Sequence, residues 1–164
     1  FLAELDIYGQ VAVEIDRSEW TVIDFSSEEP AEAAWRTFDY QGKVVAALDG
    51  ELSTFWHSAW ANESPDYPHY FVIDMQKTVK MLAVECARRQ GNGGGHTKFQ
   101  ILTSNDGVNF DDQGTFNFNK DINDFQLYPL AFLPEARYFK FVAVEGPNNY
   151  TFLSEIKVYG TVLD

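Results

Sequence analysis

The sequence is built from short segments rich in β-branched and aromatic residues, and turn-forming residues separate them. Several segments alternate apolar and polar residues, as a strand with one buried face does. The clearest are 20–25, 70–74, 99–103, 139–143 and 156–159. Only 32–38 and 43–48 show a helical pattern, and each is about two turns long. The sequence therefore predicts an all-β sandwich with long loops.

Length and charge restrict the class of protein further. A chain of 164 residues, 45% of them apolar, is one domain's worth of sequence. Lys and Arg number 12 against 25 Asp and Glu, which gives a net charge of -13. Nucleic acids and anionic lipid surfaces both require a basic patch, and the only adjacent basic pair is Arg88 and Arg89. We therefore expect no nucleic-acid partner and regard membrane binding as disfavoured.

The single cysteine, Cys86, cannot form an internal disulfide. This excludes the small secreted domains that depend on several disulfides. Cys86 lies in an apolar run and is predicted to be a buried, inert thiol.

A nine-residue segment occurs twice, because FLAELDIYG at 1–9 resembles FLSEIKVYG at 152–160. The interpretation we favour makes 1–10 a terminal strand from the end of a preceding similar domain, followed by the domain proper at 11–164. Alternatively, the chain uses two related strands in one sheet, or the match is due to chance. Since the chain also opens at Phe1 without Met, we expect it to be a piece of a larger protein.

Hard oxygen ligands are concentrated around a glycine in the segment 46–56. Calcium takes six to eight oxygens from carboxylates, hydroxyls and backbone carbonyls. Asp49 offers a carboxylate, Thr54 a hydroxyl, and Glu155 a second carboxylate from the far end of the chain. An Asp-Gly pair before a strand is also a common plain turn, so the loop alone leaves both interpretations open.

Seven short motifs follow one another along the chain in a recognisable order. They are WTVIDFSSE at 20–28, ALDGELSTFWH at 47–57, HYFVIDM at 69–75, RRQ at 88–90, SNDGVNF at 104–110, RYFKF at 137–141 and SEIKVYG at 154–160. Together they resemble the discoidin domain, also called the coagulation factor 5/8 C-type or galactose-binding-like domain, which includes family 32 of the carbohydrate-binding modules. The resemblance implies an antiparallel jelly-roll β-sandwich of about eight strands, a structural calcium, and ligand binding by loops at one end.

The resemblance also assigns residues to the metal. It implies calcium ligands from the side chains of Asp49, Thr54 and Glu155 and from the backbone carbonyls of Ala46, Glu51 and Ser154. Such an ion would connect the 46–54 loop to the last strand and act structurally.

Sugar recognition needs an aromatic face for the pyranose ring and polar groups for its hydroxyls. The candidates in the predicted loops are Trp60, Tyr67, Arg88, Arg89, Asn92, His96, Asn149 and Tyr150. In galactose-binding relatives an Arg and a nearby Asn in the corresponding loop bind the sugar. In this sequence Arg89 with Asn92 is the nearest match to that pair. Arg88 and Arg89 alternate across a strand, so only one of them is expected to face the binding loops.

Other aromatic residues have simpler interpretations. Trp20 and Trp56 lie in strand-like segments and are predicted to be core residues. Trp60 is equally consistent with an exposed stacking platform and with a loop residue packed on the sandwich rim. We favour structural roles for His57 and His69.

The sequence therefore predicts a non-catalytic module that binds a glycan or polysaccharide, within an extracellular, cell-surface or periplasmic protein with neighbouring domains. The alternative is a structural or protein-interaction domain of a larger cell-surface protein. An enzyme is not expected, because no nucleophile motif, zinc spacing or Cys-His pairing is present. Convergence of Trp60, Tyr67 and Tyr150 on one exposed patch would favour sugar binding.

Overall fold

The computed structural model describes residues 5–163. Its strands are β1 (Leu5–Ile7), β2 (Gln10–Glu14), β3 (Thr21–Phe25), β4 (Trp56–His57), β5 (His69–Ala87), β6 (Lys98–Ser104), β7 (Asp111–Asn117), β8 (Gln126–Pro129), β9 (Glu135–Glu145), β10 (Phe152–Leu153) and β11 (Glu155–Val162). Two 3-10 helices, η1 (Pro30–Trp35) and η2 (Val44–Ala47), lie within the two segments of helical pattern or close to them. None of the helices in residues 5–163 has the length and apolar character needed to span a bilayer.

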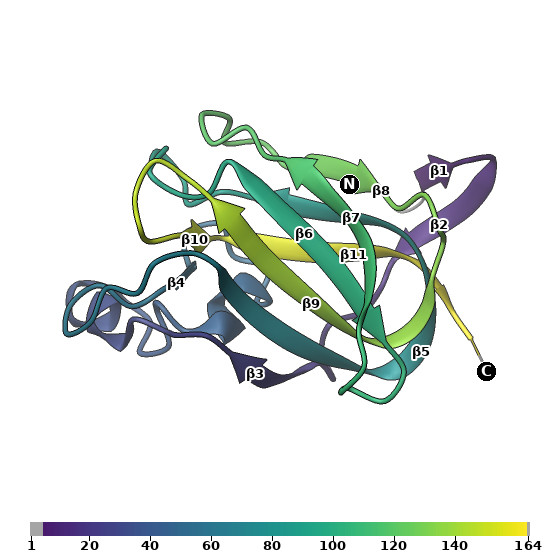
Figure 1. The fold of residues 1–164 in the computed structure, drawn as a ribbon, viewed down its shortest axis with the longest axis horizontal. Helices are drawn as coiled ribbons and strands as arrows, with labels where there is room; N and C mark the ends of the chain where they lie inside the picture. The colour runs from purple at the N-terminus through teal and green to yellow at the C-terminus, as the bar shows by residue number, and fades with distance from the viewer. Residues whose placement is uncertain (1–4, 164) are drawn as a thin grey trace.

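The long strand β5 connects the two layers of the sandwich (Figure 1). Its pairing is interrupted by a bulge between Asp74 and Val79. Before the bulge β5 pairs with β3 and β9, and β9 continues to β6 and β7. After it, β5 pairs with β8 and β11 and, through Val79 and Lys80, still with β9; β11 continues to β2 and β1. Every ladder between strands is antiparallel. The predicted all-β antiparallel sandwich is confirmed.

Aromatic rings fill the space between the layers. The rings of Phe71, Phe141 and Phe99 stack in series with centroids 5.1 and 5.2 Å apart. Trp56 meets Phe71 edge-on at 5.1 Å and is fully buried, and Trp20 is buried as well. Burying each such side chain contributes about 1.5–3 kcal/mol. The predicted core roles of both tryptophans are confirmed.

Cys86 is fully buried in this core, as predicted. Burial raises the pKa of its thiol, so the reactive thiolate is disfavoured.

The described part of the first repeat belongs to the same sheet as its second copy. β1 pairs with β2, and β2 pairs with β11 through Tyr159 and Glu14. Ile7 packs in a small buried cluster with Ala12 and Tyr159. Residues 1–4 of the repeat lie outside the described residues, and the origin of 1–10 in a preceding domain stays a prediction.

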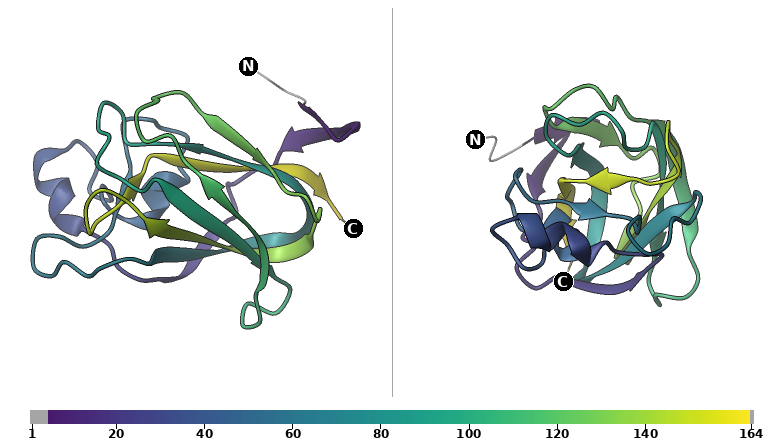
Figure 2. Two further views of the ribbon diagram at one scale, coloured as in Figure 1. Left: turned by 45° about the horizontal axis from the view of Figure 1, so that its top comes forward. Right: turned by 90° about the vertical axis from the view of Figure 1, so that its left-hand side faces the viewer.

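Both 3-10 helices and several loops gather at one end of the sandwich, at the left of Figure 1, whereas β1 and β2 lie toward the other end (Figures 1 and 2). Gly42 makes this arrangement possible. Its φ of +86° suits glycine, and a Cβ there would lie only 1.9 Å from the Glu29 carbonyl oxygen. The Gly42 N–H donates to the carbonyl of Phe55, and its carbonyl accepts from the N–H groups of Glu29 and His57. The segment leading into η1 is thereby fixed against β4.

Candidate functional site

Four polar or aromatic side chains converge at the loop end and are called here the loop-end cluster: Glu32, His57, Trp60 and Arg89. They come from three separate segments, since Glu32 lies in η1, His57 and Trp60 lie in and after β4, and Arg89 follows β5. One oxygen of Glu32 is the common point. Oε1 accepts from Trp60 Nε1 at 3.2 Å, and it lies 3.6 Å from Arg89 Nη1 and 4.0 Å from His57 Nε2.

The members of the cluster differ in their exposure to solvent. Glu32 and His57 are buried, with 6% and 4% of their surface exposed, whereas Trp60 is 39% exposed. The Arg89 guanidinium lies over the Phe55 ring at 4.1 Å. This cation–π contact holds the guanidinium plane in place without using its hydrogen-bond donors.

The protonation state of His57 follows from its contacts. Burial lowers the pKa of His57 below its usual value, which leaves the ring neutral near pH 7. Nδ1 lies 2.7 Å from the carbonyl oxygen of Ser58, which can only accept. Nδ1 therefore carries the proton, and Nε2 presents a lone pair beside Glu32.

Glu29 fixes the backbone that carries Trp60. Its Oε2 accepts from the N–H groups of Trp60 at 2.8 Å and Ala61 at 2.7 Å, and its Oε1 accepts from the N–H of Ala31 at 3.1 Å. Burial alone would raise the pKa of Glu29, but these backbone donors hold it below its usual value. A buried, ionised carboxylate thus connects η1 to the 58–68 loop.

A second cluster of oxygens lies in the 46–54 loop. The hydroxyl of Thr54 has four acceptor oxygens within hydrogen-bond distance: Asp49 Oδ2 at 2.7 Å, the Glu51 carbonyl at 2.8 Å, Asp49 Oδ1 at 2.9 Å and the Ala46 carbonyl at 3.2 Å. One hydroxyl proton can satisfy only one of them. A surplus of hard oxygens around one point is the ligand chemistry that calcium uses, so these residues fit the ion.

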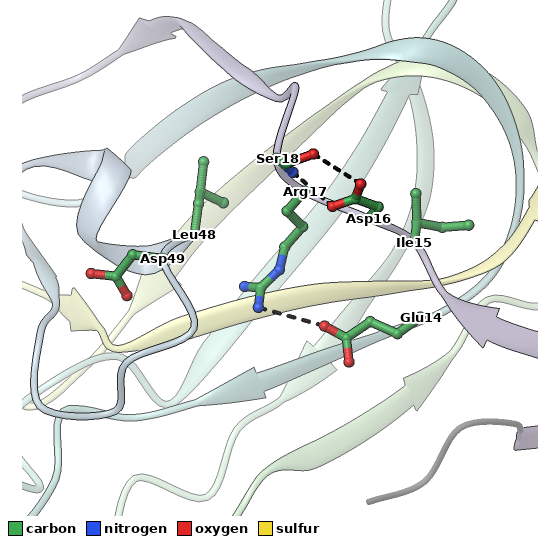
Figure 3. Close-up of a pocket in the computed structure, with 7 residues that line it drawn as sticks. All are labelled: Glu14, Ile15, Asp16, Arg17, Ser18, Leu48 and Asp49. Atoms are coloured by element: carbon green, nitrogen blue, oxygen red, sulfur yellow. Dashed lines mark hydrogen bonds and ion pairs between the residues drawn. The ribbon is translucent and has the colours of Figure 1, made fainter.

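Glu155 borders the same loop. Its Oε1 accepts from the N–H of Gly50 at 2.8 Å, and its Oε2 forms an ion pair with the guanidinium of Arg17. Burial raises the pKa of Glu155 to about 7, although Arg17 opposes the shift. In the cavity drawn in Figure 3, Arg17 extends between Glu14 and Asp49.

The sixth predicted metal residue, Ser154, is buried next to Glu155, and its hydroxyl donates to the Leu52 carbonyl at 3.2 Å. Within residues 5–163 no three His, Cys, Asp or Glu side chains form a metal-binding group. A cation here would therefore depend on two carboxylates together with hydroxyl and carbonyl oxygens.

The sequence model of the F5/8 type C domain matches residues 22–156, which is most of the chain. The chain belongs to the F5/8 type C domain family. Solved structures of similar domains share its fold. One is the C-terminal domain of a chitobiase from Bacteroides fragilis, with 28% identity and a TM-score of 0.81 over 92% of this chain and 99% of that one.

Another is a family 32 carbohydrate-binding module from Clostridium perfringens in complex with galactose, with 24% identity and a TM-score of 0.75 over 90% of this chain and 98% of that one. A third, also from Clostridium perfringens, was solved with GalNAc-β-1,3-galactose, at 21% identity and a TM-score of 0.76 over 88% of this chain and 98% of that one. These two similarities show the fold.

Curated relatives are much longer than this F5/8 type C domain. A sialidase from Micromonospora viridifaciens is 26% identical over 89% of this chain, but the match covers 22% of the sialidase. A galactose oxidase from Gibberella zeae is 32% identical over 69% of the chain and is covered to 17%. The chain therefore spans about a fifth of the length of these relatives.

Within this F5/8 type C domain, four of the predicted ligand residues lie in or beside the loop-end cluster. Trp60 and Arg89 are members of it. The Tyr150 ring lies 5.3 Å from that of His57. Asn92 lines, with Arg89, a groove of about 430 Å³.

Two further predicted ligand residues, Tyr67 and Asn149, form hydrogen bonds that connect one loop to another. The Tyr67 hydroxyl donates to the Tyr150 carbonyl at 2.9 Å, and the Asn149 amide donates to Ser64 Oγ at 2.8 Å. Tyr67 and Tyr150 thus meet through a hydrogen bond, although Tyr67 is only partly exposed.

The structure places Arg88 and His96 away from this surface, which corrects their assignment to it. The Arg88 guanidinium donates to Asn123 Oδ1 at 2.9 Å and to the Lys120 carbonyl at 2.7 Å. As the alternation predicted, only one arginine of the pair faces the cluster. His96 is 1% exposed, and its Nδ1 lies 2.8 Å from the Thr151 hydroxyl.

Sequence reasoning missed Glu32. Nothing in the sequence distinguishes Glu32 from the other acidic residues, because only the η1 fold brings it to Trp60. His57 is buried and contacts the Ser58 carbonyl, as the structural role we favoured implies, and it also lies beside Glu32. His69 likewise has the structural role we favoured, with Nε2 2.6 Å from the Asn149 carbonyl.

Proposed function

We propose that this domain is a non-catalytic carbohydrate-binding module and that the loop-end cluster is its sugar site. The observation that carries the proposal is the convergence of Trp60, Arg89 and His57 on one oxygen of Glu32. It combines an exposed aromatic face with fixed polar groups, the two chemistries that a sugar requires. The sugar-bound modules of the same fold support galactose as the first ligand to test.

Each member has a distinct proposed role. Trp60 offers its exposed face to the apolar C–H side of a pyranose ring. Arg89 donates to ring hydroxyls, and the lone pair on His57 Nε2 accepts from one. Glu32 positions Trp60 and Arg89, since it contacts both.

The site is shallow, and we expect weak binding. Dissociation constants from millimolar to high micromolar correspond to about -4 to -6 kcal/mol. Useful avidity would then come from linked copies or neighbouring domains. This fits a domain of a larger extracellular, cell-surface or periplasmic protein, which is the setting we propose.

We further propose that the 46–54 loop holds a structural calcium. The holding residues would be Asp49, Thr54 and Glu155 through side chains and Ala46, Glu51 and Ser154 through carbonyls. The ion would supply positive charge to the buried oxygens and stabilise the folded state by binding only to it. The four acceptors around the Thr54 hydroxyl support this assignment.

Isothermal titration calorimetry with galactose and galactose-terminated disaccharides tests the sugar proposal, preceded by a glycan array that selects ligands. Wild-type protein should bind, and Arg89→Gln should bind at least about fivefold more weakly because a charged donor is lost. Lys98→Gln is the matched control, since it removes the same charge from an ion pair with Glu145. A wild-type protein that binds no sugar would refute the proposal.

A further inference from the structure

The groove beside the loop-end cluster extends past Arg89. The cavity of about 430 Å³ that contains Arg89 and Asn92 also contains Arg36 and Ser53. A second cavity, of about 310 Å³, shares Arg36 and Ser53 and continues to Trp35. Arg36 thus lines both of two adjoining hollows, so a ligand that extends from Arg89 along them would pass beside it.

Arg36 differs from the other arginines of the chain. Arg17, Arg89 and Arg137 form ion pairs with carboxylates, and Arg88 donates hydrogen bonds to Asn123 and Lys120. Across residues 5–163, the Arg36 guanidinium has neither an ion pair nor a hydrogen bond. The domain has a net charge of -13, so carboxylates outnumber basic groups, and yet this arginine beside a groove pairs with none of them in the described part of the chain.

The position of the Arg36 guanidinium is nonetheless defined. It lies 5.6 Å from the centre of the Phe55 ring, the same ring over which Arg89 lies at 4.1 Å. Two guanidinium groups therefore share one buried aromatic ring. Of these two guanidinium groups, only that of Arg89 pairs with Glu32, so within residues 5–163 the charge of Arg36 has no carboxylate partner.

We propose that Arg36 binds an acid group on a sugar unit next to the one held by the loop-end cluster, so that the ligand is an anionic oligosaccharide. This inference rests on the proposed function. A guanidinium with all its donors free matches a carboxylate or a sulfate through two parallel hydrogen bonds. The five donors of Arg36 are available because its contact with Phe55 uses none of them.

Calorimetry on matched pairs of ligands tests the inference. The first pair is trigalacturonic acid and its methyl ester, which differ in charge at the carboxyl groups. The second pair is 6-sulfated galactobiose and galactobiose. Wild-type protein should bind the acidic member of at least one pair about fivefold more tightly at low salt, and the preference should shrink at high salt. The pair that shows the preference identifies the acid group.

Arg36→Gln should abolish the preference and leave galactose binding unchanged. Lys77→Gln is the matched control, because it removes the same charge from an exposed ion pair with Glu19 and should retain the preference. Equal affinity for both members of each pair, or a preference that survives Arg36→Gln, would overturn the inference while galactose binding keeps the proposed function intact. Absence of binding to every sugar would overturn both.

Discussion

The indole N–H of Trp60 donates to Glu32 Oε1 across 3.2 Å, and this bond joins the loop after β4 to η1. It holds the Trp60 ring by its edge, so that 39% of the residue remains exposed while the ring keeps a defined orientation. A fixed, exposed indole is a better platform for a sugar than a mobile one, because less side-chain entropy is lost on binding.

Replacing Trp60 with alanine should weaken galactose binding by roughly tenfold or more, because the aromatic platform is lost. Trp60→Phe keeps an aromatic face but loses the N–H, and should lie between wild type and alanine. Phe132→Ala removes another exposed aromatic residue, 73% exposed in the turn before β9, and should bind as wild type does. Calorimetry checks this, and equal affinities for Trp60→Ala and wild type would contradict the role of Trp60.

Glu32→Gln should weaken sugar binding about fivefold while the domain stays folded. The amide retains the shape of the side chain but removes the negative charge that orients Arg89. Glu63→Gln removes the same charge from an exposed residue of the 58–68 loop and is the control. Circular dichroism verifies the fold and calorimetry measures affinity; unaltered binding by Glu32→Gln would refute the positioning role.

Calcium should raise the melting temperature by about 5–10 °C relative to chelator. A ligand present at a hundredfold excess over its Kd contributes about 2.7 kcal/mol, and 1 kcal/mol shifts the Tm of a domain of this size by about 2–4 °C. Asp49→Asn should remove most of this difference, because Asp49 supplies two of the oxygens around Thr54. Asp106→Asn, which changes a carboxylate in the 104–110 turn, is the control and should keep the difference in melting temperature between calcium and chelator. Identical melting curves with calcium and with chelator would argue against the ion.

All three histidines should make the domain less stable in acid. Burial lowers the pKa of His57, His69 and His96, the last to about 3 from 6.5. A group with a folded pKa below its unfolded pKa contributes its full stability above the unfolded value and loses it as the pH falls. The free energy of unfolding should therefore fall below pH 6.5, by up to about 1.4 kcal/mol per pH unit for each histidine.

His96→Gln should flatten this dependence, because glutamine does not titrate. The measurement is urea denaturation between pH 7 and pH 4, with wild type and His96→Gln compared at each pH. A variant whose slope equals that of wild type would show that His96 does not contribute.

The strands and the core could be predicted because their signals are local. Alternation marks segments such as 70–74, and a tryptophan within a strand-like run, as at Trp56, marks a buried position. The cluster could be predicted only in part. Their chemical types mark Trp60 and Arg89 as candidates. Glu32 meets them only because it lies in a 3-10 helix that packs beside segments further along the chain, 28 positions away for Trp60 and 57 for Arg89.

His96 shows the opposite error. Its place after the glycine-rich segment predicted a loop residue at the binding surface, but the chain turns inward there and its ring packs 4.5 Å from that of Phe118. The direction of a side chain at a loop–strand junction depends on the neighbouring ladder, in this case on Thr151 beside β10. Such long-range pairing leaves no trace in a single local motif.

The most direct test of the account follows the side-chain N–H signals of Trp60 and Arg89 by NMR while galactose is added. The Trp60 indole signal is assigned by its loss in Trp60→Phe. We predict that both signals shift in a saturable manner, while the indole signals of the core residues Trp20 and Trp56 stay in place. Saturable shifts that spare Trp60 and Arg89, or no shifts at any galactose concentration, would contradict a sugar site at the loop-end cluster.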